Sequence, residues 1–517
     1  MRRGGFPFAA RLFLVQIPYV NTTRILWDAA DAWADRIAVR DDAQCLTYGA
    51  LASRASAVGD ALMACGVRTG DRVCTLLPHG ADAAAAIYGA AATGASVAVL
   101  NWLSRPRQVE FALRHTGASV LVASRSWQGQ QVRALDATVP VLYVEDLPAA
   151  GRLLPVARVD TDLAQICFTS GSTGAPKGVA ITHANLHAGI RTVVDYLGIV
   201  RDDRIASLLP FSSVYGFNQL NCAIATGATL EIMSSVIAPD VVRALAEREC
   251  SVLAAVPPLW MQFLNVGEFR QSLPRLRLLT CAGGRLSPDS VRALRSAQPQ
   301  ARLFLMYGLT EVFRSTFLPP EEVDAHPDSM GRSVPDSRVF VVREDGTECA
   351  DDEVGELVHA GPTVAAGYWN DPEATAKTFR PNPFSPDFAG PLGRAVFSGD
   401  LVRRDGAGRL YYVGRRDRMI KTRGYRVSPD EIVDVLLASR LLVDAAVTSE
   451  PDPRSGDRIV AHVVLGSGAT LEALRRWGGA ELPRYMLPAR WDVREVLPRT
   501  ASGKHDLVAL AGKAALG

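Results

Sequence analysis

The segment Phe168-Thr-Ser-Gly-Ser-Thr-Gly-Ala-Pro-Lys-Gly178 directly follows an apolar, strand-like run at residues 163–168. Its eleven positions hold three glycines and four hydroxyl residues, which make a poor core segment. Glycines let backbone N–H groups turn toward an anion, hydroxyl groups add donors, and Lys177 supplies a positive charge. The segment therefore predicts a phosphate-binding loop rather than a flexible surface loop. It is not a Walker A loop, because Pro176 stands where that motif requires a glycine.

Around this loop the chain alternates between helical and strand-like patterns. Residues 50–65 have a helical pattern, residues 72–77 a strand pattern, and an alanine-rich helical stretch then leads to a strand at 95–100. A second series of the same kind covers residues 202–306. Such alternation predicts β-α-β units and a largely parallel sheet in each of two subdomains.

The sequence pattern changes beyond Gly331, where short strand-like runs are separated by Gly, Asp and Pro. We expect a small β-barrel-like unit there, followed after Gly414 by a compact strand–helix–strand region. The expected fold class is α/β. A large N-terminal domain at residues 1–415 would contain the two βα sheet subdomains and the β-barrel-like unit, and a compact, mobile α+β domain would occupy residues 416–517.

Composition excludes several classes of protein. The chain has 517 residues, 48% of them hydrophobic, and 56 Lys+Arg against 54 Asp+Glu. A net charge of +2 gives no general attraction to nucleic acid or to an anionic membrane, so we expect neither partner. The eight cysteines are scattered without a C-x-x-C pair, which argues against a zinc ribbon or a disulfide framework and favours a reducing, cytoplasmic location.

Three stretches have an alternative interpretation. The basic, apolar start at residues 1–20 is interrupted by Arg11, which disfavours a signal peptide. The alanine-rich residues 81–103 are long enough to span a membrane, but their polar and glycine residues favour a buried helix followed by a strand. His183 and His187 have the i,i+4 spacing of a metal pair, yet no glutamate lies between them, so we expect surface histidines.

Six motifs in order resemble those of the adenylate-forming enzymes, which include acyl-CoA synthetases, aryl-CoA ligases, luciferases and nonribosomal adenylation domains. The resemblance covers residue 46 to the C-terminus. The motifs are the phosphate loop at 170–177, Y-G-x-T-E at 307–311, T-G-D-L as Ser-Gly-Asp-Leu at 398–401, G-R-x-D at 414–417 followed by K-x-R-G-x-R at 421–426, L-P-x-Y-M-x-P at 482–488, and the terminal G-K motif at 498–504.

The resemblance implies that ATP and a carboxylic acid form an acyl-adenylate with release of pyrophosphate, and that the acyl group then passes to a phosphopantetheine thiol of CoA or an acyl carrier protein. Bringing two anions together needs cations, and a Mg²⁺ ion held by Glu311 would serve the departing pyrophosphate. Thr310 would donate to the α-phosphate. The implied ATP-binding residues are Thr169, Ser170, Gly171, Ser172, Thr173, Gly174, Lys177, Gly283, Gly284, Tyr307, Asp400 and Arg415.

Within this set, Tyr307 offers a flat face for adenine opposite the Ala282–Gly284 stretch, and Asp400 suits the two ribose hydroxyls. The resemblance makes Lys504 the catalytic cation that bridges the carboxylate and the phosphate; the alternative is a solvated lysine of the tail. Asp417 resembles the family's hinge, with an ordinary loop aspartate as the alternative, and Gly424 would lie beside the thiol channel.

The same alignment implies the residues of the acyl pocket. Ser213 stands where acyl- and aryl-CoA ligases commonly carry a gating histidine, and Val214 where amino-acid-activating domains carry an aspartate for the α-ammonium group. Arg314 could pair with a second carboxylate of a short acid, or it could be an internally paired structural arginine. The expected pocket residues are Val214, Tyr215, Asn218, Thr280, Ala282, Met306, Arg314 and Ser315.

Three functions remain open from the sequence. The first is an AMP-forming acid–thiol ligase, and the similarity of residues 310–328 and 420–430 to exosortase-associated acyl ligases makes an acyl carrier protein a candidate acceptor. The second is a free-standing amino-acid adenylation enzyme that loads a peptidyl carrier protein, which K-x-R-G-Y-R favours and Val214 opposes. The third is an inactive, nucleotide-binding interaction module, which should have lost Glu311, Asp400 or Lys504.

Overall fold

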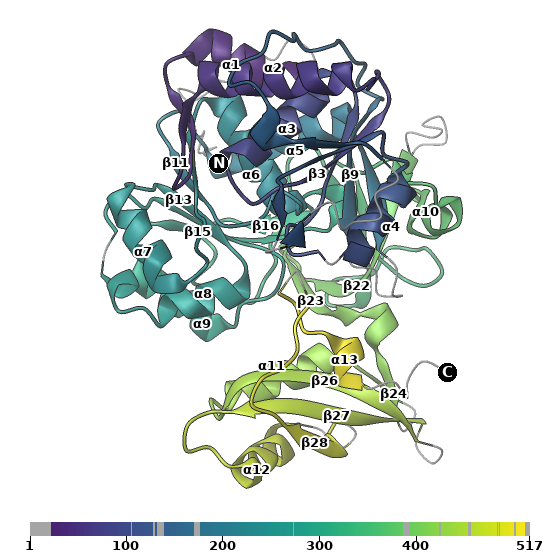
Figure 1. Ribbon diagram of the computed structural model, residues 1–517. Helices are drawn as coiled ribbons and strands as arrows, with labels where there is room; N and C mark the ends of the chain where they lie inside the picture. Colours follow the sequence, from purple (N-terminus) through teal and green to yellow (C-terminus); the bar gives the residue numbers. More distant parts are fainter. Residues whose placement is uncertain are drawn as a thin grey trace, which may run out of the picture. The chain divides into compact units, whose positions relative to one another are not determined.

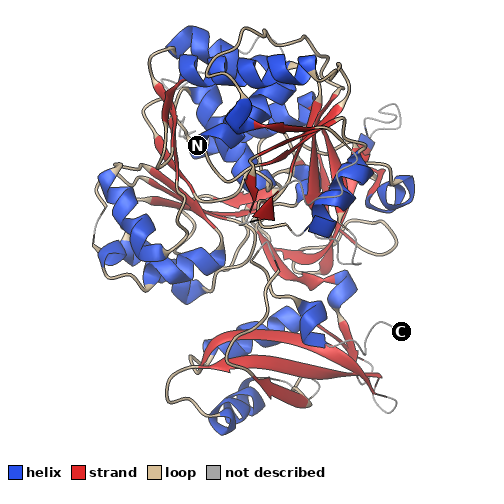
Figure 2. Cartoon of the chain, in the orientation of Figure 1, coloured by secondary structure: helices blue, strands red, loops and turns tan. Residues whose placement is uncertain are grey.

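This computed structural model describes residues 22–104, 106–127, 130–131, 139–169, 176–271, 273–385, 393–422, 425–452, 456–482, 484, 486–500 and 503–511. The chain divides into two compact units (Figures 1 and 2). One comprises Met1–Val339 with His359–Val396, and the other comprises Phe340–Val358 with Phe397–Gly517. The expected domain boundary at 415/416 stays a prediction.

The first unit contains a nine-stranded sheet in the order β17-β16-β15-β14-β13-β11-β12-β1-β2. The strands from β15 to β1 run parallel, whereas β2, β16 and β17 add antiparallel strands at the edges. The strands are β1 (Ile37–Arg40), β2 (Cys45–Thr47), β11 (Arg204–Ser207), β12 (Thr229–Ile232), β13 (Val252–Ala255), β14 (Leu278–Cys281), β15 (Arg302–Tyr307), β16 (Thr316–Leu318) and β17 (Arg332–Ser333).

A seven-stranded sheet has the order β20-β10-β9-β4-β3-β5-β8. It is parallel from β9 to β8, and β10 and β20 pair antiparallel beyond β9. Its strands are β3 (Arg72–Leu76), β4 (Ser96–Val99), β5 (Val120–Ala123), β8 (Val141–Tyr143), β9 (Leu163–Thr169), β10 (Lys177–Thr182) and β20 (Gly367–Tyr368); β6 (Ser126–Trp127) and β7 (Gln130–Gln131) form a separate pair. The prediction of two largely parallel sheets is confirmed.

The helices of this unit begin and end at residues suited to those positions. Thr182 and Asn185 form a capping box at the start of α5, and Gly198 ends that helix in the left-handed conformation. Ser213 caps α6 by accepting from the Gly216 N–H. The helices are α1 (Ile25–Trp33), α2 (Tyr48–Ala64), α3 (Ala81–Ala92), α4 (Pro106–Thr116), α5 (His183–Leu197), α6 (Val214–Thr226), α7 (Ala238–Glu247), α8 (Pro257–Leu264), α9 (Pro288–Ala297) and α10 (Pro372–Thr378).

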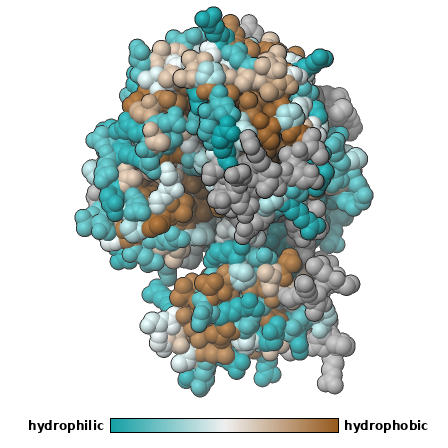
Figure 3. All heavy atoms as spheres, viewed as in Figure 1, coloured by the Kyte–Doolittle hydropathy of each residue, from teal (hydrophilic) through white to brown (hydrophobic). Residues whose placement is uncertain are grey.

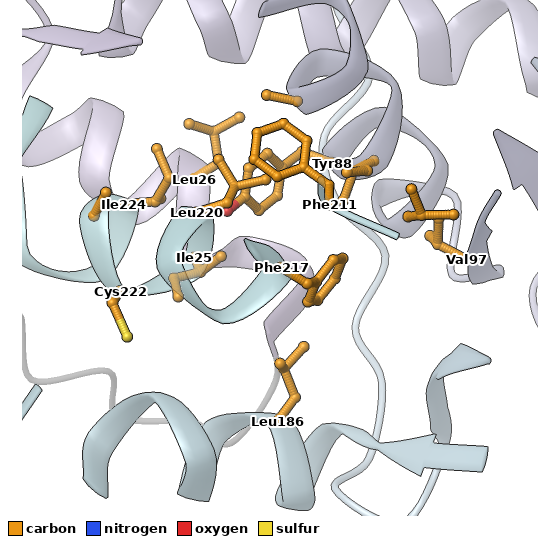
Figure 4. Close-up of a cluster of buried hydrophobic side chains, with 14 of the residues drawn as sticks. Ile25, Leu26, Tyr88, Val97, Leu186, Phe211, Phe217, Leu220, Cys222 and Ile224 are labelled. Atoms are coloured by element: carbon orange, nitrogen blue, oxygen red, sulfur yellow. The ribbon is translucent and has the colours of Figure 1, made fainter. Parts of the chain in front are cut away.

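The main core gathers around α6, which supplies Phe217, Leu220 and Ile224 to a buried cluster (Figure 4). The alanine-rich segment belongs to the same core: α3 is almost wholly buried and leads to the buried strand β4. The helix-then-strand prediction for this segment is confirmed. Along the described part of the chain, we find no helix that combines the length and apolar character needed to cross a membrane.

His183 corrects one expectation. Its side chain is buried at the start of α5, where Nδ1 lies 2.7 Å from the Thr22 hydroxyl. Burial, aided by the nearby Arg158 charge, lowers the pKa of His183 to about 4. The predicted surface position is therefore wrong for His183, because a residue 161 positions earlier in the chain covers it. His187 is half-buried.

The second unit contributes to two further sheets. One is five-stranded, with the order β18-β19-β22-β21 and β23 paired to β22; the other has the order β25-β24-β27-β26 with β28 paired to β27. Helices α11 (Pro429–Ala438), α12 (Leu471–Glu481) and α13 (Leu507–Ala511) accompany the latter. The strands are β18 (Arg338–Val342), β19 (Val354–Ala360), β21 (Phe379–Pro381), β22 (Arg394–Arg404), β23 (Leu410–Arg415), β24 (Ile420–Thr422), β25 (Tyr425–Val427), β26 (Leu442–Asp452), β27 (Gly456–Leu465) and β28 (Arg490–Val493).

The expected α+β character of the C-terminal region is confirmed. Its core joins Ile432 and Leu436 of α11 to Val447 and Ile459 of the sheet and to Leu474 of α12. Hydrophobic residues also reach the surface of this unit on the face drawn in Figure 3, and its exposed apolar side chains include Val443, Val496 and Val508.

Candidate active site

The predicted phosphate loop connects two antiparallel strands. β9 ends at Thr169 and β10 begins at Lys177, and these two residues are partners in the ladder. The Thr169 hydroxyl lies 3.5 Å from the Lys177 carbonyl oxygen. The expected phosphate-binding residues Ser170, Gly171, Ser172, Thr173 and Gly174 lie outside the described residues. The structure therefore fixes both ends of the loop.

Tyr368 brings Lys177 and Glu311 into one cluster. Its hydroxyl donates to Glu311 Oε1 at 2.6 Å, and Lys177 Nζ lies 5.1 Å from the centroid of its ring. The pairing of β20 with β10 places Tyr368 opposite Val179, two residues from Lys177. Sequence reasoning predicted the lysine and the glutamate but missed the tyrosine that lies between them.

Glu311 fits the magnesium ligand that the resemblance implies. Among the residues that the structure describes, no group of three or more His, Cys, Asp or Glu side chains could hold a metal ion. Mg²⁺ is commonly bound by one or two carboxylates together with substrate phosphates, so a single half-buried glutamate beside a phosphate loop suits it. The bound ion would neutralise phosphate charge.

Tyr307 and the Ala282–Gly284 stretch leave the nine-stranded sheet at the same edge. Tyr307 ends β15 and Ala282 follows β14, and these strands pair with Cys281 opposite Leu305. Gly283 is exposed and has a φ of +84°, a conformation that favours glycine. This edge thus offers an aromatic ring and an open backbone surface, as a planar base requires.

A cavity lies between α5, α6 and the strands β11, β13, β14 and β15. The centre of a water-sized sphere can occupy about 20 Å³ of it, within about 360 Å³ of space free of atoms that also includes open solvent. Five of the eight expected acyl-pocket residues line it: Tyr215, Asn218, Thr280, Met306 and Arg314. The other lining residues, which the sequence did not indicate, are Val193, Leu197, Ile199, Ile205, Gln219, Cys222, Val252 and Ala254.

Three expected residues are not among those lining this cavity. Val214 is the first residue of α6 and is buried in the core, and buried Ala282 lies just beyond β14. Ser315 is fully buried, with its hydroxyl 2.7 Å from His359 Nδ1. His359 also lies 3.1 Å from the Thr363 hydroxyl through Nε2, and burial lowers its pKa to about 3. Ser315 therefore holds a neutral histidine.

Two tyrosines are influenced by Arg314, and one of them, Tyr215, lines the cavity with it. The Tyr215 hydroxyl lies 2.6 Å from the Thr280 hydroxyl, and the Arg314 guanidinium carbon lies 4.2 Å from the centre of the Tyr215 ring. Burial raises the pKa of Tyr196 to about 12, although the Arg314 charge acts in the opposite direction. The cavity thus combines apolar walls with a buried cation and neutral hydroxyl groups.

The Y-G-x-T-E motif has little space at its glycine. A Cβ atom built at Gly308 would lie 2.6 Å from the Phe313 carbonyl oxygen. We therefore expect Gly308→Ala to lower the free energy of unfolding by about 1–3 kcal/mol, measured by chemical denaturation. Gly479→Ala is the matched control, because Gly479 lies in α12 and no atom is near its Cβ position. This substitution should raise the free energy of unfolding by roughly 0.5–1 kcal/mol. Equal effects of the two substitutions would contradict the crowding at Gly308.

The second unit contains Asp400 and Arg415. Asp400 is buried, and Arg415 Nη1 donates to its Oδ1 at 3.1 Å across the β22–β23 ladder. Gly399 has a φ of +73° and donates its N–H to Glu356, which also pairs with Arg416 at 2.6 Å. The two expected nucleotide-binding residues therefore lie together within this unit.

Lys504 lies in a tight turn that is anchored to β26. The Thr500 N–H donates to the Lys504 carbonyl oxygen at 2.7 Å, and Lys504 itself is exposed. On either side of the lysine, Arg499 Nη2 and His505 Nε2 contact the Asp444 carboxylate at 2.6 and 2.9 Å. Among the remaining predicted residues, the Asp417 side chain and Gly424 lie outside what the structure describes.

Comparison with known proteins identifies the family. Residues 26–369 match the model of the AMP-binding enzyme family, and residues 431–504 match that of the AMP-binding enzyme C-terminal domain. The chain belongs to the AMP-binding enzyme family. It is 31% identical to surfactin synthase subunit 1 of Bacillus subtilis over 96% of its own length, but it spans only 14% of that synthase.

Two further AMP-binding relatives match nearly end to end. An L-proline–[L-prolyl-carrier protein] ligase of Pseudomonas fluorescens is 30% identical, with 92% of this chain and 95% of that protein covered. The structure of o-succinylbenzoate CoA synthetase of Bacillus subtilis, in complex with an acyl-adenylate, gives a TM-score of 0.83 at 26% identity, with 93% of this chain and 96% of that chain covered. These likenesses confirm the resemblance to adenylate-forming enzymes and the predicted α/β fold. The exosortase-associated subgroup stays a prediction.

Proposed function

We propose that this AMP-binding enzyme activates a carboxylic acid with ATP and transfers the acyl group to a phosphopantetheine thiol. The cluster of Lys177, Tyr368 and Glu311 carries the proposal, because it gathers a cation and a carboxylate at the end of the phosphate loop. In the first step a carboxylate oxygen attacks the α-phosphorus and pyrophosphate leaves. In the second a thiolate attacks the acyl carbonyl carbon and AMP leaves.

The chain's own side chains have distinct tasks in the first step. Lys177 would balance phosphate charge, Glu311 would hold the magnesium ion, and Tyr368 would keep the Glu311 carboxylate in place. Thr310 would donate to the α-phosphate. Lys504 would enter from the C-terminal domain and stabilise the charge that grows between the acid and the phosphate, and rotation at Asp417 would withdraw it afterwards.

The cavity favours an acid without an α-ammonium group. Among the described residues that line it, there is no Asp or Glu that could pair with an ammonium ion. A buried, unpaired ammonium group would be costly. The second candidate is activation of an amino acid for a peptidyl carrier protein, and it is supported by the 30% identity to the L-prolyl-carrier protein ligase.

ATP–pyrophosphate exchange across a panel of carboxylic and amino acids tests the proposal. We expect exchange with one class of acid lacking an α-amino group. Adding CoA or a holo-carrier protein to the competent reaction then identifies the acceptor, for which the prolyl-carrier ligase favours a carrier protein. Exchange with no acid would contradict the proposed function, and exchange with α-amino acids alone would establish the second candidate.

Asp444 should position the catalytic lysine. We expect Asp444→Asn, which keeps the shape but removes the charge that holds Arg499 and His505, to slow ATP–pyrophosphate exchange about 5- to 10-fold. Thioester formation from a supplied acyl-adenylate should be unchanged. Asp492→Asn is the matched control, because Asp492 also contacts one histidine and one arginine in this unit. An equal loss in both half-reactions would indicate a purely structural role.

The same cluster should be sensitive to acid. Burial tends to raise the pKa of Asp444, but the hydrogen bond from His505 and the charges of His505 and Arg499 outweigh burial and keep this pKa below its ordinary value. Its contribution to stability is therefore complete above the unfolded pKa and is lost as the pH falls through the lower folded pKa. The difference in unfolding free energy between wild type and Asp444→Asn should accordingly shrink on acidification.

A further inference from the structure

The geometry points to Arg314 as the residue that binds a second carboxylate at the far end of the substrate, so that the acid activated is a dicarboxylic acid. This inference rests on the proposed function, because it names the class of acid that the cavity accepts. It concerns the distal end of the substrate, away from the carboxylate that reacts with ATP.

Arg314 is a buried cation without an acidic partner. It is only 6% exposed, and it makes no ion pair with any described carboxylate. Its Nη1 donates to the Phe313 carbonyl oxygen at a long 3.4 Å, and its buried Nε has no acceptor. A guanidinium stays charged at all physiological pH values, so burial without an anion is costly unless a ligand supplies one.

The backbone directly before Arg314 adopts a strained turn. Phe313 has φ +57° and ψ −72°, and the Arg314 N–H donates to the Val312 carbonyl oxygen at 2.6 Å. These values describe a γ-turn of the rare, strained kind, which bulky residues seldom adopt. Gly189 of α5 leaves room for the Phe313 ring, since a Cβ at this glycine would lie 3.1 Å from it. Strain of this kind is typical of functional sites.

The rest of the cavity suits a polar distal group. The Tyr215 ring stacks against the guanidinium, which leaves the edge of the arginine for a ligand. Asn218 and Gln219 also line the cavity, and a side-chain amide can donate hydrogen bonds to a carboxylate through its NH2 group. Arginine binds a carboxylate with two parallel hydrogen bonds, which is the best use of its planar donors. An aliphatic tail would leave the buried Arg314 guanidinium without an anion.

The test compares dicarboxylic acids of increasing length with their monomethyl esters in ATP–pyrophosphate exchange. We expect the best substrate to be a dicarboxylic acid whose ester has a kcat/KM lower by about 10- to 100-fold. Arg314→Met should bring this ratio close to one, and Arg314→Lys should retain part of it. The ratio is taken within each variant, so partial unfolding does not affect it.

Arg302→Met is the matched control. Arg302 begins β15, the strand whose Met306 lines the cavity, but Arg302 itself is exposed, so this variant should keep both the activity and the preference of the wild type. If simple acids and esters exchange as well as diacids, and Arg314→Met leaves their ranking unchanged, the inference is overturned while the proposed function stands. If no acid supports exchange, both are overturned. A preference for an acid with a distal sulfonate or phosphonate over every dicarboxylate would also overturn the assignment of a carboxylate.

Discussion

Replacing Lys504 by alanine should slow acyl-adenylate formation by roughly 10²–10³-fold, equivalent to about 3–4 kcal/mol of transition-state stabilisation. The ammonium group is expected to act only in the first half-reaction, where the carboxylate meets the α-phosphate. Thioester formation from a supplied acyl-adenylate should therefore proceed at the rate of the wild type. ATP–pyrophosphate exchange measures the first step, and single-turnover transfer from the purified adenylate measures the second.

Lys377→Ala is the matched control for this variant. Lys377 is an exposed lysine of α10 whose partner is Glu373, one turn away, so its loss should leave both half-reactions unchanged. Loss of both half-reactions in Lys504→Ala would remove the lysine from its proposed role. Exchange at the rate of the wild type would do the same.

The fold could be predicted from the sequence because it depends on local patterns. Hydrophobic periodicity predicted the helix–strand alternation, and the alanine-rich segment became α3 and β4 as expected. The burial of His183 could not be predicted from the sequence, because it involves a contact with Thr22, which lies 161 positions earlier in the chain. Tyr368 was missed for the same reason: only the pairing of β20 with β10 brings it to Lys177.

The motif alignment predicted only some of the residues that line the cavity. One face of α6 lines the cavity with an i, i+3, i+4, i+7 pattern of residues: Tyr215, Asn218, Gln219 and Cys222. Applying this helical spacing to the sequence would have added Gln219 and Cys222 to the predicted pocket and would have excluded Val214. Arg314 lines the cavity, whereas its neighbour Ser315 contacts His359. Adjacent residues in extended chain point to opposite sides, and the alignment could not say which of the two points inward.

Glu311→Gln should reduce acyl-adenylate formation roughly 10²-fold or more, and should raise the Mg²⁺ concentration needed for half-maximal exchange. Glutamine keeps the length of the side chain and an oxygen that can accept from the Tyr368 hydroxyl, which donates to Glu311 at 2.6 Å. Only the negative charge is lost, so the variant separates charge from shape. A Mg²⁺ titration of ATP–pyrophosphate exchange provides the measurement.

Tyr368→Phe completes the comparison, because it leaves the Glu311 charge intact and removes only the hydroxyl that holds it. We expect about a 10-fold loss in exchange, since the carboxylate keeps its charge but loses a charge-assisted hydrogen bond. Glu322→Gln is the control, because it removes another carboxylate from the first unit. Glu322 pairs there with Arg332. If Glu311→Gln and Glu322→Gln had equal effects, or if Tyr368→Phe cost as much as Glu311→Gln, the negative charge at Glu311 would not be the property that this site requires.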